Sequence, residues 1–204
     1  MGPSPDPIRV LVVDDHEAVR AGLERVLERT PDLQPIGGVA DGRELCSLLD
    51  RERIDVAVLD YDLERGDGLS LCLRLKQRAE SPAVVIYSGY AAPGLVFAAT
   101  VAQADAVVSK AQPVDVLLSS IRRLAAGERL LDPPAPDMLG AAAARLSTED
   151  LPLMALLADR ADTSKIALAL GVERTEVARR ARRVVGLLRG GSVRTPGIPT
   201  LKRP

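Results

Sequence analysis

The first 127 residues alternate between short apolar runs and longer stretches with helical periodicity. The apolar runs are rich in β-branched residues and predict strands buried on both faces, as in a parallel sheet. These strands are expected near residues 8–13, 35–40, 56–60, 83–87 and 106–109. The stretches between and after them place apolar residues every three or four positions. They predict helices near residues 16–29, 43–51, 67–78, 93–103 and 113–126.

Strands and helices in this alternation predict a doubly wound α/β domain over residues 1–127, because parallel strands need crossover helices of one hand. The flavodoxin-like order 2-1-3-4-5 is the expected arrangement of the five strands. In that order the first and third strands are neighbours. The carboxyl ends of all five strands lie along one edge, where open α/β sheets bind ligands.

The pattern changes after Gly127. Residues 128–145 include the proline-rich run 131–136, which cannot propagate a helix or a strand ladder and indicates a semi-rigid linker. Residues 146–190 have a wholly helical pattern and predict a small all-α domain. The final segment, residues 191–204, has no periodicity, and we expect it to be disordered.

Three helices are expected in the all-α domain. Ser147–Asp150 looks like a helix start, with a hydroxyl cap and carboxylates in the first turn. A second, short helix starts at Thr163 and ends at Gly171, and a third runs from about Arg174 to Leu188. A short helix, a glycine-containing turn and a longer helix are typical of a helix-turn-helix.

Polar residues end or follow four of the predicted strands: Asp14, Asp15, Asp60, Ser88 and Lys110. Because the strand ends share one edge, we expect these side chains to converge. Mg²⁺ prefers oxygen ligands and binds through one or two carboxylates. Asp15 and Asp60 are the expected direct ligands, and Asp14 acts through water or by orienting its neighbour. The backbone carbonyl of Asp62 could supply a further oxygen.

The same cluster suits phosphoryl transfer, which needs an acceptor, charge neutralisation and positioning. Asp60, at a strand tip, is the expected nucleophile and phosphoacceptor. Lys110 would neutralise one phosphoryl oxygen, and Ser88 would donate a hydrogen bond to another. The sequence therefore predicts a site that takes a phosphoryl group onto a carboxylate in the presence of Mg²⁺.

Charge divides the chain in two. The net charge of −1 is the sum of −5 over residues 1–127 and +4 over residues 128–204. This asymmetry favours an acidic chemical module joined to a module that binds a polyanion. The alternative is chance variation between two solvated surfaces.

Composition also excludes several classes of protein. The two cysteines, Cys46 and Cys72, lie in helical patterns and form neither a disulfide framework nor a metal site. No signal peptide is visible at the start, and no apolar run reaches the roughly 18 residues of a membrane span. We therefore expect a cytoplasmic protein with no membrane partner.

Residues 8–127 resemble the receiver domain of two-component response regulators. The resemblance rests on the run Val12–His16, on Leu59–Leu63 followed by Gly66–Gly68, and on Ser88 and Lys110. It implies that Asp60 accepts a phosphoryl group from a sensor histidine kinase, with Mg²⁺ required. His16, the only histidine, is expected to begin a helix rather than to donate phosphate.

Residues 146–188 resemble the LuxR/NarL-type helix-turn-helix output domain, and the order receiver, linker, output domain is that of the family. In the third helix, Arg side chains face outward, and Arg suits both phosphates and guanine edges. We expect DNA contacts from Arg174, Thr175, Arg179 and Arg183, and a phosphate contact from Lys165. An arginine-rich solvated face with no DNA partner is the alternative.

One departure from the family concerns the switch position. The family usually has Tyr or Phe three residues before the lysine, and here that residue is Val107. In the family, the aromatic ring turns inward when the hydroxyl residue moves toward the phosphate. Val107 cannot report that movement in the same way, so coupling of phosphorylation to output is either absent or uses another surface.

The leading hypothesis is a transcription regulator that is phosphorylated on Asp60 by a histidine kinase and binds promoter DNA as a homodimer. The second is a regulator of the same fold that a ligand or protein partner controls without phosphorylation. The third is a Mg²⁺-dependent aspartyl phosphatase, suggested by Asp60-Tyr61-Asp62, although the acidic pair Asp14–Asp15 comes too early for that class. We therefore expect no enzyme.

Overall fold

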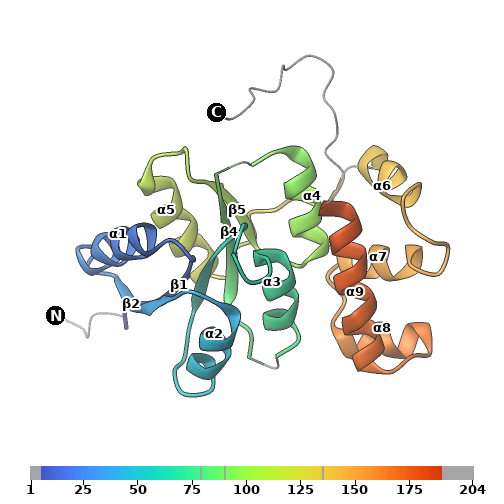
Figure 1. The fold of residues 1–204 in the computed structure, drawn as a ribbon, viewed down its shortest axis with the longest axis horizontal. Helices are drawn as coiled ribbons and strands as arrows, with labels where there is room; N and C mark the ends of the chain where they lie inside the picture. The colour runs from blue at the N-terminus through green and yellow to red at the C-terminus, as the bar shows by residue number, and fades with distance from the viewer. Residues whose placement is uncertain (1–5, 79, 90, 135, 190–204) are drawn as a thin grey trace, which may run out of the picture.

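The computed structural model describes residues 6–189 apart from residues 79, 90 and 135. Its first part is a parallel sheet with the strand order β2-β1-β3-β4-β5, which confirms the predicted topology. The strands are β1 (Ile8–Val13), β2 (Leu33–Val39), β3 (Val56–Asp60), β4 (Ala83–Ser88) and β5 (Ala106–Ser109). The helices that alternate with them are α1 (Glu17–Glu28), α2 (Gly42–Leu49), α3 (Gly68–Lys76), α4 (Pro93–Val101) and α5 (Val114–Ala125) (Figure 1).

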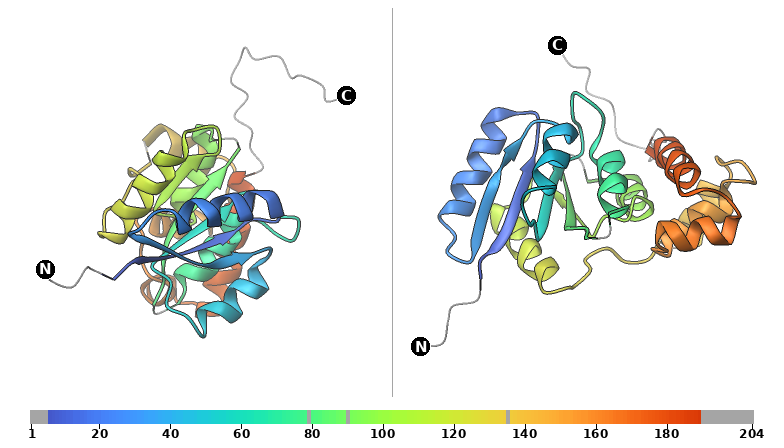
Figure 2. Two further views of the ribbon diagram at one scale, coloured as in Figure 1. Left: turned by 90° about the vertical axis from the view of Figure 1, so that its left-hand side faces the viewer. Right: turned by 90° about the horizontal axis from the view of Figure 1, so that it is seen from below.

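Helices cover both faces of the sheet (Figure 2). Val10 and Val12 of β1 belong to the apolar cluster beneath α1 and α5. Leu11 and Val13 belong to the cluster beneath α2, α3 and α4. All four side chains are buried, because successive residues of a strand point to opposite faces. Burial on both faces explains why the central strands are continuous apolar runs rather than alternating ones.

The second strand begins earlier than predicted, at Leu33 instead of residue 35, and ends at Val39. It is an edge strand, where Pro35 is tolerated because its missing N–H faces away from the ladder. The register with β1 shifts between Val10 and Leu11, which pair with Pro35 and Gly37. Gly37 adopts a φ of +130° at this bulge, a conformation that only glycine reaches easily.

The second part of the chain is helical: α6 (Pro136–Ala143), α7 (Leu151–Ala158), α8 (Thr163–Leu170) and α9 (Arg174–Arg189). In α8, the Asp162 carboxylate accepts the backbone N–H of Ser164 and of Lys165, and Gly171 ends the helix with a φ of +65°. Within the part of the chain that the structure describes, no helix is both long and apolar enough to cross a bilayer. The expected disorder of residues 191–204 concerns residues outside that part.

Two details differ from expectation. The expected linker, residues 128–145, contains helix α6, because proline is compatible with a first helical turn even though it breaks a helix interior. The start of α7 has no hydroxyl cap: Asp150 occupies the cap position and makes no capping bond. Its carboxylate instead accepts a hydrogen bond from the Ser147 hydroxyl at 3.0 Å.

The helical part packs against the α3–α4 side of the sheet domain. Helix α9 contacts α3 and α4, and α7 contacts α4 (Figure 1). A single apolar cluster contains Phe97 of α4, Leu153 of α7 and Val184 of α9, all buried. The two parts therefore share a continuous core.

Polar contacts also join the two parts of the chain. The Arg160 guanidinium lies 2.9 Å from the Asp105 carboxylate, which Lys76 also contacts at 2.6 Å. Arg160 donates to the carbonyl of Gln103 at 3.2 Å, and the Gln103 side chain donates to the carbonyl of Ala161 at 2.9 Å. Gln103 and Arg160 have φ values of +65° and +58°. Because such values are rare for residues with a Cβ atom, the reciprocal bonds stabilise both turns.

The start of α3 approaches β3 so closely that only glycine fits at position 68. A Cβ atom there would overlap the carbonyl oxygen of Asp60, whereas one at Gly22, on the exposed side of α1, would meet nothing within 4 Å. We predict that Gly68→Ala lowers the free energy of unfolding by about 1–3 kcal/mol. Gly22→Ala should leave it unchanged or raise it by about 0.5–1 kcal/mol, because alanine favours helices. Chemical denaturation measures both, and equal effects would contradict the packing described.

Candidate functional site

The predicted polar residues meet at the carboxyl edge of the sheet. Val13 pairs with Leu59, so Asp14 follows β1 beside the Asp60 end of β3. Ser88 pairs with Ser109, and Lys110 follows directly. Asp14, Asp60 and Ser88 are only 1%, 5% and 2% exposed. The fold thus brings polar residues from four strand ends to one edge of the sheet, where Asp14, Asp60 and Ser88 are buried.

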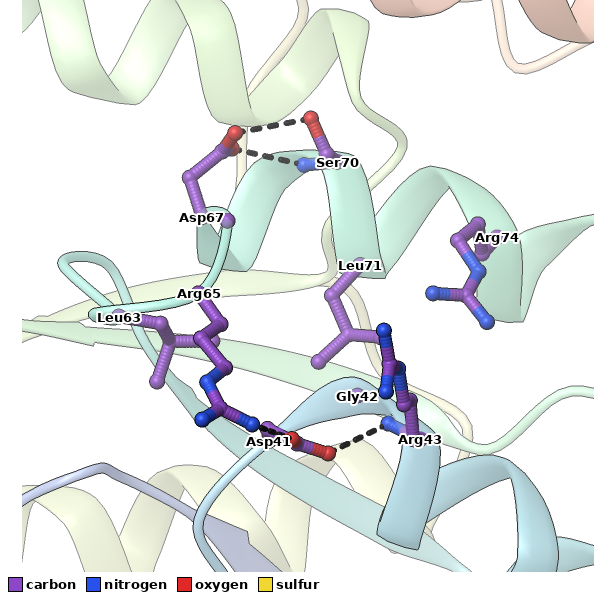
Figure 3. A pocket seen from close by; sticks show the side chains of 10 residues that line it. Asp41, Gly42, Arg43, Leu63, Arg65, Asp67, Ser70, Leu71 and Arg74 are labelled. Carbon is purple, nitrogen blue, oxygen red and sulfur yellow. Dashed lines mark hydrogen bonds and ion pairs between the residues drawn. The ribbon is translucent and has the colours of Figure 1, made fainter.

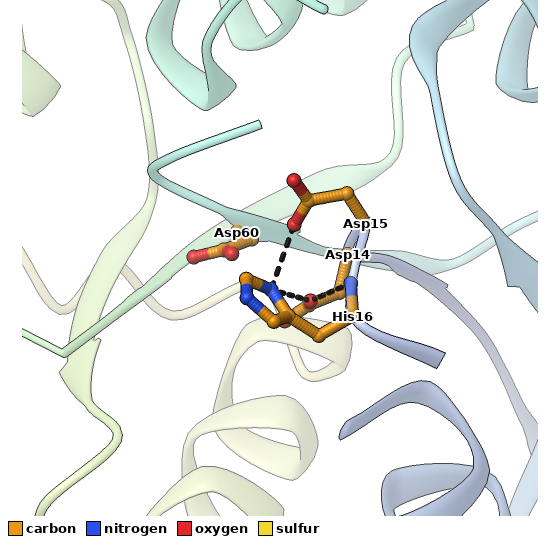
Figure 4. Close-up of side chains that lie close together, drawn as sticks. All are labelled: Asp14, Asp15, His16 and Asp60. Atoms are coloured by element: carbon orange, nitrogen blue, oxygen red, sulfur yellow. Dashed lines mark hydrogen bonds and ion pairs between the residues drawn. The ribbon is translucent and has the colours of Figure 1, made fainter. Parts of the chain in front are cut away.

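Four residues of this cluster place potential metal ligands together (Figure 4). One ligand atom each of Asp14, Asp15, His16 and Asp60 lies within 4.8 Å of the others. His16 stands at the cap position of α1 but makes no side-chain capping bond. Its backbone N–H donates to Asp14 at 2.8 Å, and its Nδ1 lies 2.8 Å from Oδ1 of Asp15.

The donor set fits a hard divalent cation such as Mg²⁺, because three carboxylates converge there. Oδ1 of Asp15 is buried, and its contact with His16 lacks hydrogen-bond geometry, so it has no hydrogen-bond partner among the described residues. The other oxygen of Asp15 accepts the backbone N–H of Glu64 at 2.9 Å. A buried carboxylate oxygen without a donor is unfavourable unless a cation meets it.

Lys110 bridges two of the carboxylates. Its Nζ lies 2.7 Å from Oδ2 of Asp14 and 3.0 Å from Oδ1 of Asp60. The ammonium group also lies 5.6 Å from the centre of the Tyr87 ring. The lysine therefore neutralises part of the acidic cluster and sits where a group bound to Asp60 would meet a positive charge.

Burial dominates the titration of Asp60. It raises the pKa of the Asp60 carboxyl above its ordinary value, although the hydrogen bond and positive charge of Lys110 oppose the shift. For Lys110, burial alone would lower the pKa, but the hydrogen bonds to Asp14 and Asp60 outweigh it and raise the pKa. The ammonium therefore stays charged, and the carboxyl that it contacts is held in an environment that disfavours its negative charge.

Three further residues were predicted to belong to this site: Ser88, Val107 and Asp62. Ser88 is buried at the end of β4, and its carbonyl accepts the backbone N–H of Lys110 at 2.7 Å. Val107 lies on β5, partly buried against the apolar cluster that includes α4. The Asp62 side chain is 81% exposed, and its backbone forms an isolated bridge with Asp67. These three roles stay predictions.

The residues predicted to bind DNA lie on the outer surface of the helical part. Arg174 and Thr175 are exposed in the first turn of α9. Arg179 is exposed and lies 2.6 Å from Glu176. Lys165 of α8 lies 3.6 Å from Asp162. All four are reachable by a partner, and their binding roles stay predictions.

Arg183 has a structural partner that the periodicity of α9 did not predict. It contacts the Asp150 carboxylate at 2.8 Å, and Arg180 contacts the same carboxylate at 3.1 Å. Asp150 is only 2% exposed, while Arg183 remains 46% exposed. Burial alone would raise the pKa of Asp150, but hydrogen bonds from Arg183, Ser147 and Arg180 outweigh it and lower the pKa. Arg183 therefore joins α9 to α7 as well as facing solvent.

Arg189, at the end of α9, was not singled out from the sequence. Its guanidinium lies 4.9 Å from the centre of the Tyr61 ring and donates to the Tyr61 hydroxyl at 3.0 Å. It also lies 3.3 Å from Asp62 and 3.1 Å from Asp67. All of these partners lie in the loop between β3 and α3, directly after Asp60. No local pattern could have indicated this contact, because it joins residues more than 120 positions apart.

Comparisons with known proteins identify a family to which most of the sheet domain is similar. Residues 10–122 match the family described as the response regulator receiver domain. The DNA-binding transcriptional activator DevR/DosR of Mycobacterium tuberculosis is 34% identical over 125 residues, which cover 61% of this chain and 58% of that protein. The chain spans about three fifths of the length of the curated relatives it matches in this way.

Solved structures extend the likeness. A two-component response regulator of the LuxR family from Aurantimonas sp. SI85-9A1 is 26% identical, with a TM-score of 0.58 over 65% of this chain and 92% of that chain. RcsB from Salmonella enterica serovar Typhimurium, solved bound to a promoter, covers 90% of this chain and 93% of its own with a TM-score of 0.55. At 20% identity, that second likeness concerns the fold alone.

We predict that Lys110→Gln lowers the free energy of unfolding at pH 7 by about 2–4 kcal/mol, because two mostly buried carboxylates lose their shared cation. The loss should shrink as the pH falls through the raised pKa of Asp60, since that carboxyl then becomes neutral. Added Mg²⁺ should stabilise the variant more than the unmodified chain. Lys165→Gln, at an exposed position, is the control. Thermal unfolding measures these effects, and an equal response of both variants would contradict the bridging role.

Proposed function

Because the chain belongs to the response regulator receiver domain family, we propose that it is a two-component transcription regulator that accepts a phosphoryl group on Asp60. The observation that carries the proposal is the contact of Lys110 with both Asp14 and Asp60 in a buried carboxylate cluster. Asp60 would receive the group from a phosphorylated histidine of a sensor kinase. Promoter DNA, bound by a homodimer, would be the output.

The chain's own residues would divide the transfer between them. An oxygen of the Asp60 carboxylate forms the new bond to phosphorus as the bond to the donor nitrogen breaks. Lys110 exchanges its contact with Asp60 for a phosphoryl oxygen and keeps Asp14, and Ser88 donates to another oxygen. Asp14, Asp15 and Asp60 would hold Mg²⁺, which supplies charge neutralisation when bound. The raised pKa of Asp60 is consistent with a carboxylate that gains from cationic partners.

The experiment is mass spectrometry of the intact chain after treatment with acetyl phosphate and Mg²⁺. We predict one base-labile phosphoryl adduct, lost in Asp60→Asn and retained in Asp62→Asn, because of these two aspartates only Asp60 has its side chain inside the cluster. Chelation of Mg²⁺ should prevent the adduct. An adduct that survives Asp60→Asn, or no adduct at all, would overturn the proposal.

We propose further that α9 enters the major groove through the exposed side that carries Arg174, Thr175 and Arg179. A helix in that groove is flanked by phosphate backbones, and here one flank of α9 is occupied by α3 and α4. The docked arrangement would therefore have to open before DNA binds. Arg189 fastens the end of α9 to the loop after Asp60, so a change at Asp60 would act on this contact through the loop.

Arg179→Ala should weaken binding to a random-sequence DNA duplex about fivefold at low salt and reduce the salt slope by about 1, because one phosphate contact is lost. Arg129→Ala, at an exposed position outside the output helices, should leave both unchanged. Fluorescence anisotropy at several salt concentrations measures the slope. Identical slopes for the two variants would show that Arg179 faces solvent only.

Arg189→Ala should favour the open arrangement by roughly 1 kcal/mol, because it removes partly exposed ion pairs and a ring contact between the two parts. Small-angle scattering should then show a larger radius of gyration, and DNA affinity should rise without a phosphodonor. Arg78→Gln, which removes an ion pair with Asp50 inside the receiver part, is the matched control. An unchanged radius in Arg189→Ala would argue against this fastening.

Val107 favours a second candidate function, a regulator of the same fold that works without phosphorylation. Valine offers no ring that could turn inward behind Ser88. The two candidates differ in one measurement: equal DNA affinity with and without acetyl phosphate, in a chain that does form the adduct, would favour the second.

A further inference from the structure

A cavity of about 210 Å³ lies along the loop between β3 and α3 and has none of the carboxylates Asp14, Asp15 and Asp60 in its lining. Its walls are α2, the loop from Leu63 to Asp67 and α3 (Figure 3). Each wall contributes one arginine: Arg43 from the first turn of α2, Arg65 from the loop and Arg74 from α3. We call this space the arginine cavity.

The two carboxylates that line the arginine cavity do not neutralise the charge of its three arginines. Asp41 accepts two backbone N–H groups of α2 as its helix cap, at 2.7 and 3.2 Å. Asp67 accepts the backbone N–H and hydroxyl of Ser70 and pairs with Arg189. Both carboxylates therefore already serve other groups.

The arginines themselves lack strong partners. Arg65 lies 3.9 Å from Asp41, at the limit of an ion pair. Arg74 donates to the sulfur of Cys46 at 3.0 Å. Among the described residues, Arg43 has no carboxylate within ion-pair distance. All three arginines are exposed at the rim of one hollow, where their positive charges would attract an anion.

The rest of the lining suits an organic molecule rather than a bare ion. Leu63 and Leu71 are buried residues that face the hollow (Figure 3). Gly42 allows the first turn of α2 to approach α3 closely, since a Cβ atom there would lie 2.9 Å from Leu71 and 3.5 Å from Arg74. Small ligand sites combine apolar walls with a few polar groups in this way.

We propose that the arginine cavity binds a small organic anion that bears carboxylate or phosphate groups. The guanidinium fork matches both groups with paired N–H donors. Asp67 lines the cavity and also holds Arg189 of α9. A bound anion therefore lies next to the contact between the receiver part and α9. Its binding would influence that contact independently of Asp60.

The experiment is ¹⁵N NMR of the full chain titrated with citrate, and separately with inorganic phosphate, at constant ionic strength. Saturable shifts of the amides of residues 41–43 and 63–74 are expected. Saturation by citrate alone assigns the site to carboxylates, and saturation by phosphate alone assigns it to phosphorylated ligands. Shifts that do not saturate, or that centre on Asp14 and Lys110, would overturn the proposal.

Variants locate the binding. Arg43→Gln, Arg65→Gln and Arg74→Gln should each weaken it by about tenfold, the value of one charged hydrogen-bond contact. Arg25→Gln, exposed on α1, should leave it unchanged. Asp60→Asn should also retain it, which separates this site from phosphoryl acceptance. Equal affinity in all three cavity variants and in the control would refute the arginine cavity as the site.

Discussion

The ammonium group of Lys110 makes the acidic cluster possible. It contacts Asp14 at 2.7 Å and Asp60 at 3.0 Å, in a place where both carboxylates are almost fully buried. Two such charges without a cation would be strongly unfavourable. The parallel sheet supplies the geometry, because the residues come from strand ends that the strand order places side by side. Chemistry and topology are thus linked: the order β2-β1-β3-β4-β5 is what turns separate polar residues into one site.

The same strand end connects the site to the helical part. The loop after Asp60 carries Tyr61, Asp62 and Asp67, and all three contact Arg189. A second set of polar contacts joins the two parts: Asp105, just before β5, pairs with Arg160 of the helical part and with Lys76 of α3. An apolar core shared by both parts lies alongside these polar contacts. The proposed regulation needs no aromatic residue at position 107, because the loop itself touches α9.

Much of this could be predicted from the sequence, because strands buried on both faces leave continuous apolar runs and the polar residues that follow them are fixed in register. Asp14, Asp60 and Lys110 meet for that reason. The docking of the helical part could not be predicted, since it depends on pairs distant in sequence, such as Asp105 with Arg160 and Tyr61 with Arg189. Helical periodicity places Arg183 outward, but it cannot reveal that Asp150 of another segment reaches it. The helix within residues 136–143 was missed because prolines mask a helix that begins at one of them.

The most direct test of this account is an NMR pH titration of the Asp60 carboxyl carbon, with and without Mg²⁺, assigned by its loss in Asp60→Asn. Burial outweighs Lys110 in the free chain, so Asp60 should titrate above the ordinary pKa of an aspartate. Mg²⁺ should lower that pKa, because the cation favours the ionised carboxylate. The opposite result would be a pKa equal to that of an exposed aspartate and unchanged by Mg²⁺. It would contradict the role of Asp60 and Lys110 in a buried, metal-binding cluster.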